Sequence, residues 1–205
     1  DVLVDLLGVA AGGINTRLSR IIRDHAADQF APGSAPARML LDGRPVSPAG
    51  ATLAGGMTID AYDAHDGHRL TKGHAGCAAL PAAVAMAEAT GKLDGGDLMI
   101  SLLLGYEIGT RAGIALHRTA CDYHTTGAWT ALSCAAIAAR YLELGVDQTR
   151  HALGIAEYHG PRSQMMRCIG PSMKWRRGAS KLMARRRSPA RKRQCTSSPP
   201  PSCRR

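Results

Sequence analysis

The segment 60–76 gathers many potentially reactive side chains in seventeen residues. It holds three aspartates, three of the chain's eight histidines, one lysine and one arginine, between two apolar, helix-like stretches. Solvated loops favour Lys, Glu, Ser and Asn, so this density of histidine predicts a chemical site. Histidine exchanges protons near neutral pH, and lysine or arginine can hold a carboxylate or stabilise developing negative charge.

The same segment also offers metal ligands. The nitrogen and oxygen donors that would suit zinc or a non-haem metal are Asp63, His65, Asp66, His68 and His74. Their spacing fits neither His-Glu-x-x-His nor a facial triad, and a lysine and an arginine add positive charge beside them. We therefore expect no metal and no cofactor, and a metal-dependent hydrolase stays open as an alternative.

The elements that must position this segment are mainly helical. Hydrophobic residues make up 45% of the 205-residue chain but aromatic residues only 4%, so the core must be built from Ala, Leu, Ile, Val and Met. That composition favours close-packed helices over a β-sandwich. The one convincing β signal is a short hairpin over 38–46, with Asp42 and Gly43 as its turn. The expected fold class is mainly α, a helical bundle with one hairpin.

Apolar spacings of three and four, together with capping residues, predict where the helices lie. A first helix should begin at Val2 and run, past a break at Gly12 and Gly13, to about Phe30. The later helices should start near Pro48, cover Ala78–Thr90, run from a cap at Asp97 to about Leu116, cover Gly127–Leu144 behind Thr125 or Thr126, and start again at Asp147. Small residues at the expected contacts predict tight antiparallel packing.

Residues 174–205 differ from the rest of the chain in composition. They contain twelve Lys and Arg and no Asp or Glu, which leaves 14 basic and 16 acidic residues in 1–173, a net charge of −2. We expect a disordered basic tail, and its abrupt change of composition favours an out-of-frame translation of a GC-rich gene. The alternative is a non-catalytic protein whose basic arm binds nucleic acid through phosphates. The basic run 185–193 has no interleaved aromatic residue, which argues against nucleic acid.

Cysteine and hydropathy patterns bear on the compartment. The six cysteines form no C-x-x-C pair, so buried thiols in a reducing cytosol are expected rather than disulfides or an iron–sulfur cluster. Glu107 and Arg111 interrupt the longest apolar run before it reaches the roughly 18 to 20 residues that a membrane span needs. The sequence therefore predicts a cytoplasmic protein without a membrane partner.

Six short motifs follow one another in a single order along the chain. They are Thr58–Asp63, His74–Gly76, Ala79–Ala82, Gly105–Glu107, Tyr123–Thr126 and His151–Ala156. This succession resembles the MmgE/PrpD family, which includes 2-methylcitrate dehydratase, cis-aconitate decarboxylase and iminodisuccinate epimerase. The resemblance covers residues 1–173.

The resemblance implies a cofactor-independent lyase or isomerase. Such an enzyme dehydrates, decarboxylates or epimerises a small di- or tricarboxylate next to a carboxylate. In the family the helical domain is completed by a smaller α/β domain and further helices, so we expect residues 1–173 to be a fragment of a protein about twice as long. A homodimer is expected at full length, and a chain truncated in this way can lack activity.

The resemblance also assigns roles to residues. Asp63 matches the family's aspartate and would orient or tune a basic partner, and His74 and His124 match its acid and base histidines. Lys174 matches the family's lysine more loosely and would complete the catalytic set.

Three further residues are expected to bind the substrate. Charge alone points to Arg69 and Lys72 as carboxylate clamps, with His68 beside them. The loop carries one residue more before His74 than many members, which indicates a different substrate choice.

Overall fold

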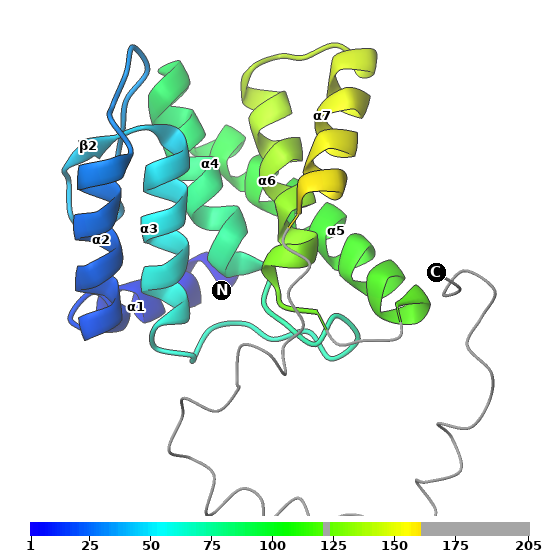
Figure 1. Ribbon diagram of the computed structural model, residues 1–205, viewed down its shortest axis with the longest axis horizontal. Coiled ribbons are helices and arrows are strands. Elements are labelled where there is room, and N and C mark those ends of the chain that lie inside the picture. Colours follow the sequence, from blue (N-terminus) through cyan, green and yellow to red (C-terminus); the bar gives the residue numbers. More distant parts are fainter. Residues whose placement is uncertain (121–123, 161–205) are drawn as a thin grey trace, which may run out of the picture.

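A computed structural model describes residues 1–120 and 124–160 (Figure 1). Within them the elements are, in order, α1 (Val2–Gly13), α2 (Arg17–Gln29), β1 (Ala37–Arg38), β2 (Pro45–Val46), α3 (Pro48–Asp60), α4 (Gly76–Thr90), α5 (Gly95–Thr119), α6 (Gly127–Tyr141) and α7 (Val146–His159). The predicted mainly α class is confirmed, and so is the hairpin, where Ala37 pairs with Val46 and Arg38 with Pro45. The predicted tail, 174–205, lies outside the described residues.

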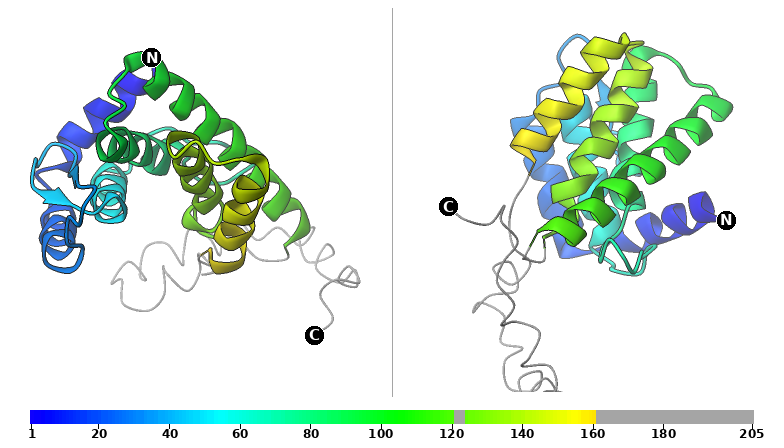
Figure 2. Two further views of the ribbon diagram at one scale, coloured as in Figure 1. Left: turned by 90° about the horizontal axis from the view of Figure 1, so that it is seen from above. Right: turned by 90° about the vertical axis from the view of Figure 1, so that its right-hand side faces the viewer.

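The helices form two layers. Figure 1 shows α2, α3, α4, α6 and α7 side by side in one row. In both views of Figure 2, α1 and α5 lie on the same side of that row and cross it at an angle. The connection between α3 and α4, which is the histidine-rich segment, runs beneath the row in Figure 1, along the lower ends of its helices. The C-terminus of α3 and the N-termini of α4 and α6 therefore lie next to the segment where chemistry was predicted.

The predicted first helix is two helices. The chain bends by 91° between α1 and α2. Thr16 makes the corner, because its hydroxyl donates to the Gly13 carbonyl oxygen at 2.7 Å and accepts from the Ser19 N–H at 3.1 Å, which caps α2. A Cβ on Gly13 would lie 2.0 Å from the carbonyl oxygen of Thr58, so only glycine lets α1 cross α3 at this point.

The structure corrects some of the predicted helix boundaries, among them the start of α5 and the end of α6. Helix α5 begins after Asp94 rather than at Asp97, because the Asp94 carboxylate, on an extended backbone, accepts from the Asp97 N–H at 2.9 Å. Helix α6 ends at Tyr141, three residues before the predicted Leu144. Both errors move a boundary without changing which faces pack together.

Helix α4 forms the centre of the main core. Its Ala79, Leu80 and Ala83 are each at most 1% exposed and pack with Leu6 of α1 and Ile137 of α6. Helix α5 approaches this cluster closely because a Cβ on Gly105 would lie 2.9 Å from the Cβ of Ala79. The Ser133 hydroxyl of α6 donates to the Gly105 carbonyl oxygen at 2.8 Å and joins the two helices. Small residues therefore produce the tight packing that the sequence predicted.

Helix α5 has the length and composition of a membrane-crossing helix, and among the described residues it is the only unbroken helix that does; α1 and α2 reach them only together, across their 91° bend. The sequence predicted no membrane-spanning segment. Helix α5 also has a face buried against α4 and α6, through Ser101, Leu102, Gly105, Gly109 and Gly113. A core helix of a packed domain has the same length and composition, so this finding carries no assignment to a membrane.

The hairpin is attached to α2 by a charged cluster around Asp42. The Asp42 side chain is 8% exposed and accepts from Arg23 Nη1 and from Arg44 Nε, each at 2.7 Å. Hydrogen bonds from Arg44 are the largest of the influences on this carboxyl, and with Arg23 they outweigh the opposing effect of burial and lower its pKa from 3.8 to about 2. The ionised carboxylate is therefore the form that the folded state prefers.

This cluster predicts a specific acid sensitivity. Because the folded-state pKa of Asp42 is below its unfolded value, its stabilisation is present above about pH 4 and is lost as the pH falls toward 2. Asp42→Asn should lower the free energy of unfolding by about 1–2 kcal/mol at pH 7 and flatten the pH dependence between those limits. Urea unfolding at a series of pH values measures this, with exposed Asp28→Asn as the control. Equal slopes for wild type and Asp42→Asn would contradict the prediction.

Candidate functional site

The loop between α3 and α4, residues 61–75, is folded back on itself by a short turn. The His68 N–H donates to the Gly73 carbonyl oxygen at 3.0 Å, and the Lys72 N–H donates to the His68 carbonyl oxygen at 2.9 Å. The Thr71 hydroxyl also donates to the His68 carbonyl oxygen, at 3.0 Å, and the Thr71 side chain is fully buried. Lys72 closes the turn with φ of +54°, a left-handed conformation. The sequence predicted a loop here, and the structure confirms it. Hydrogen bonds between residues 68 and 73 give the loop a defined turn.

Trp129 of α6 lies beneath this turn. Its side chain is among the largest that are fully buried, at 1% exposure. A Cβ on Gly73 would lie 3.1 Å from the Trp129 ring, and a Cβ on Gly113 of α5 would lie 3.0 Å from the ring and 2.9 Å from Thr71. Two glycines therefore allow the loop, α5 and α6 to close around one indole.

His74 is held in a defined orientation at the end of the loop. Its Nδ1 lies 2.5 Å from the Asp66 carbonyl oxygen, and its backbone N–H donates to the Thr126 hydroxyl at 3.4 Å. A carbonyl oxygen can only accept, so Nδ1 of the neutral ring carries the proton and Nε2 keeps its lone pair. That Nε2 lies 3.9 Å from Asp63 Oδ1. The geometry suits a base at Nε2 whose protonated form is stabilised by the Asp63 carboxylate.

A cavity of about 710 Å³ opens beside His74. Its lining comes from the end of α3, the loop, the start of α4 and the start of α6: Thr52, Leu53, Gly56, Met57, Asp60, Asp63, His74, Cys77, Ala78, Thr125, Thr126, Gly127 and Thr130. Two helix N-termini, those of α4 and α6, thus contribute to one cavity, and each carries the positive end of a helix dipole. Around these helix N-termini the lining carries hydroxyl groups, one imidazole and the carboxylates of Asp60 and Asp63.

A second histidine is buried next to His74. The His65 side chain is fully buried, its ring centroid lies 4.0 Å from that of His74, and its Nε2 lies 3.6 Å from Asp60 Oδ1. Burial, and then the proximity of His74, lowers the pKa of His65, so the neutral imidazole is favoured. Donor atoms of Asp60, His65 and Cys77 all lie within 4.8 Å of one another. Among the described residues this trio, rather than the five possible donors that the sequence offered, has its donor atoms close enough to hold one metal ion.

The structure brings together two of the predicted site residues and separates others. Asp63 and His74 share the 710 Å³ cavity. The predicted carboxylate ligands, Arg69, Lys72 and His68, are exposed on the loop and do not line that cavity. Among the described residues, the cavity lining holds no lysine or arginine. The fourth predicted catalytic residue, Lys174, lies outside the described residues.

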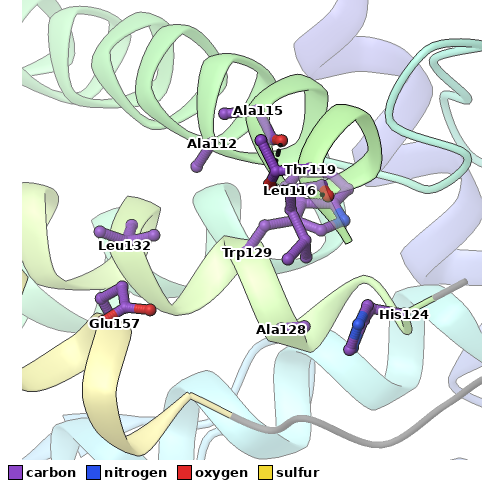
Figure 3. Close-up of a pocket in the computed structure, with 9 residues that line it drawn as sticks. All are labelled: Ala112, Ala115, Leu116, Thr119, His124, Ala128, Trp129, Leu132 and Glu157. Carbon is purple, nitrogen blue, oxygen red and sulfur yellow. Dashed lines mark hydrogen bonds between the residues drawn. The ribbon is translucent and has the colours of Figure 1, made fainter. Parts of the chain in front are cut away.

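His124 lines a different and smaller cavity. Figure 3 shows it just before α6, with Trp129 and Leu132 of α6 and Glu157 of α7 also in the lining of a space of about 280 Å³. His124 Nδ1 is buried without a hydrogen-bond partner among the described residues. His124 and His74 therefore lie on different cavities, and a joint acid–base role for the two stays a prediction.

Three residues shape the site in ways that the sequence did not predict. Thr126 was expected to cap α6, but its side chain makes no capping hydrogen bond and accepts from His74 instead. Tyr106 and Asp66 pack together at Gly76, where a Cβ would lie 2.2 Å from the Tyr106 hydroxyl and 2.5 Å from Asp66 Oδ1. Burial and the charge of Asp66 raise the pKa of Tyr106, which stays protonated. The Gly-Tyr-Glu motif carried the signal for Tyr106; nothing in the sequence singled out Thr126 for the loop.

The fold and the loop define a helical domain in which His74 and Asp63 lie at the wall of one cavity. Residues 1–183 match the model of the MmgE/PrpD N-terminal domain, so the chain belongs to the MmgE/PrpD family. A stretch of 122 residues is 30% identical to the cis-aconitate decarboxylase-like protein oryM of Aspergillus oryzae. That match covers 55% of this chain and 25% of the relative, so the chain spans about a quarter of the relative's length.

Proposed function

We propose that this chain carries the proton-transfer part of a lyase or isomerase that acts on a small di- or tricarboxylate. The observation that supports the proposal most is the orientation of His74. Its Nδ1 is engaged by the Asp66 carbonyl oxygen, so its Nε2 is left as a base 3.9 Å from Asp63 and at the wall of a cavity. The membership of the MmgE/PrpD family and the relative named for cis-aconitate decarboxylation favour the same class of substrate.

The proposed chemistry begins with proton abstraction. His74 Nε2 takes the proton from a carbon next to a carboxylate, and the C–H electron pair moves into that carboxylate as an enediolate. The imidazolium that forms is stabilised by the Asp63 carboxylate. Loss of a hydroxide with a proton from an acid completes a dehydration, and return of the proton to the opposite face completes an epimerisation. In a decarboxylation the histidine acts in its protonated form: the bond to a neighbouring carboxylate breaks with release of CO₂, and the electron pair left on the carbon skeleton takes a proton from the His74 imidazolium.

The substrate's carboxylates are proposed to meet the starts of α4 and α6. The Thr126 hydroxyl lines the cavity there and can donate to a carboxylate oxygen, while the Thr130 hydroxyl donates to the Thr126 carbonyl oxygen at 3.1 Å. The dipoles of both helices favour negative charge at that end. Lysine or arginine clamps for a second carboxylate would have to come from outside the described lining, which is consistent with the chain spanning about a quarter of its relative.

Binding and isotope exchange by the full chain test the proposal. The chain is titrated with cis-aconitate and 2-methylcitrate, and with acetate as the monocarboxylate control, while histidine ring signals are followed by NMR. We expect saturable shifts of the His74 ring signals with the polycarboxylates only. The same samples in D₂O should show solvent deuterium entering the carbon next to a carboxylate, a half-reaction that needs the base alone. Neither binding nor exchange with any of these compounds would overturn the proposal.

A further inference from the structure

The loop buries one imidazole that its fold does not explain. His65 is 7% exposed although both loop neighbours Ala64 and Asp66 are less buried, and both ring nitrogens lack a hydrogen-bond partner among the described residues. A buried polar group without a partner costs about 1–3 kcal/mol, so such groups call for a ligand, a water or an ion. The ring has no part in the proposed proton transfer, which uses His74.

A carboxylate and a thiol lie close to this ring. Asp60, the last residue of α3, places Oδ1 3.6 Å from His65 Nε2. Cys77, in the first turn of α4, is 8% exposed, and all three donor atoms lie within 4.8 Å of one another. One oxygen, one nitrogen and one sulfur donor is a ligand set that zinc accepts. Zinc–ligand lengths place tetrahedral donors roughly 3.3–3.8 Å apart, so closure around an ion needs movements of about an ångström or less.

We propose that Asp60, His65 and Cys77 form a binding site for a thiophilic divalent metal ion such as Zn²⁺. The ion would be held by three side chains from α3, the loop and α4, and would fix both ends of the loop to the helices it connects. Asp60 and Cys77 also line the 710 Å³ cavity, so the fourth coordination position faces that cavity. A water molecule or an anion from solution would fill it.

A divalent cation would balance the charges that the three ligands carry when they bind it. Neutral imidazole is the ligand form, and the Cys77 thiol releases its proton to solvent as the metal–sulfur bond forms. One thiolate and one carboxylate then neutralise the two positive charges of the ion. Without the ion, the thiol donates weakly to the His74 carbonyl oxygen at 3.4 Å.

Cobalt is the probe for this site, because a cobalt–thiolate bond absorbs strongly in the near ultraviolet. The full chain, stripped of metal with a chelator, is titrated with Co²⁺ and then with Zn²⁺ in competition. We expect one equivalent of Co²⁺ to give the thiolate band and Zn²⁺ to displace it. Cys77→Ser should remove the band, while Cys134→Ser, which alters a partly buried thiol outside the trio, should keep it. A band that survives Cys77→Ser, or no saturation at one equivalent, would overturn the proposal.

Asp60→Asn provides a second measurement of metal binding. It does not disturb a buried side chain, because the Asp60 side chain is 59% exposed. It should weaken Zn²⁺ binding about tenfold or more and reduce the rise in melting temperature that Zn²⁺ gives the wild type. His68→Gln, on the exposed part of the same loop, is the matched control and should bind Zn²⁺ as the wild type does. Equal Zn²⁺ affinity in Asp60→Asn and wild type counts against Asp60 as a ligand. All these measurements omit substrate, so their outcome is independent of the proposed lyase chemistry.

Discussion

Replacing His74 with asparagine is expected to lower deuterium exchange and turnover of the polycarboxylate by about 100-fold or more. General base catalysis contributes roughly 10²–10⁴-fold, and the substitution removes the group that would supply it. An asparagine amide nitrogen can take the place of Nδ1 and keep the hydrogen bond to the Asp66 carbonyl oxygen. The orientation of the loop should therefore persist while the Nε2 lone pair is lost.

The split between rate and binding distinguishes this role from a structural one. Because the helix N-termini and the Thr126 hydroxyl hold the carboxylates in the proposed complex, His74→Asn should change kcat far more than the dissociation constant. Exchange rates by NMR and binding by calorimetry measure the two quantities separately. His151→Asn, an exposed histidine of α7, is the control and should match the wild type. Wild-type exchange in His74→Asn would exclude His74 as the base.

Asp63 has a different role from His74 in the proposed chemistry. Its carboxylate lies 3.9 Å from His74 Nε2 and is 84% exposed, so its attraction for the imidazolium is reduced by solvent. A supporting charge of this kind stabilises the protonated base without accepting the proton itself. The proposal thus assigns the proton to His74 and the electrostatic support to Asp63, which keeps the order of roles that the family resemblance implies.

The sequence predicted those parts of the site that depend on local spacing. Asp63 and His74 lie in one short loop, so a meeting of their side chains needed only that loop to fold back. The turn at Asp42 and Gly43, and the helix that begins at Pro48 behind the Ser47 cap, are local in the same way. Such features follow from turn and capping preferences of neighbouring residues, which a single sequence carries.

The parts of the site that the sequence did not predict depend on packing between distant segments. Thr126 contacts His74 from 52 residues further along the chain, whereas His124, two residues before Thr126, lines the other, smaller cavity. His65 was one of several loop histidines, and only the packing of α3 and α4 shows that it is buried. The positive charges of Arg69 and Lys72 suggested that they bind the substrate, but the turn leaves both side chains exposed.

The junction of the loop with α5 and α6 predicts the largest effect on stability, from Trp129→Ala. The indole is 1% exposed, and Gly73 and Gly113 give it the room it fills. Removing such a side chain costs about 3–5 kcal/mol, from lost burial and from the cavity that remains. Because Thr71 and the loop pack at the same place, the loop should lose its support along with the core.

Trp129→Phe separates the loss of volume from the loss of the indole N–H. Trp129 Nε1 is buried without a hydrogen-bond partner among the described residues, so phenylalanine removes a group that gains nothing there. We expect Trp129→Phe to lower the free energy of unfolding by about 1–2 kcal/mol, well short of Trp129→Ala. Urea unfolding gives both values, and amide exchange at His68 and Lys72, whose N–H groups close the turn, reports the loop. If Trp129→Ala lost less than about 1 kcal/mol with unchanged exchange at these amides, the indole would not be what holds the histidine loop in place.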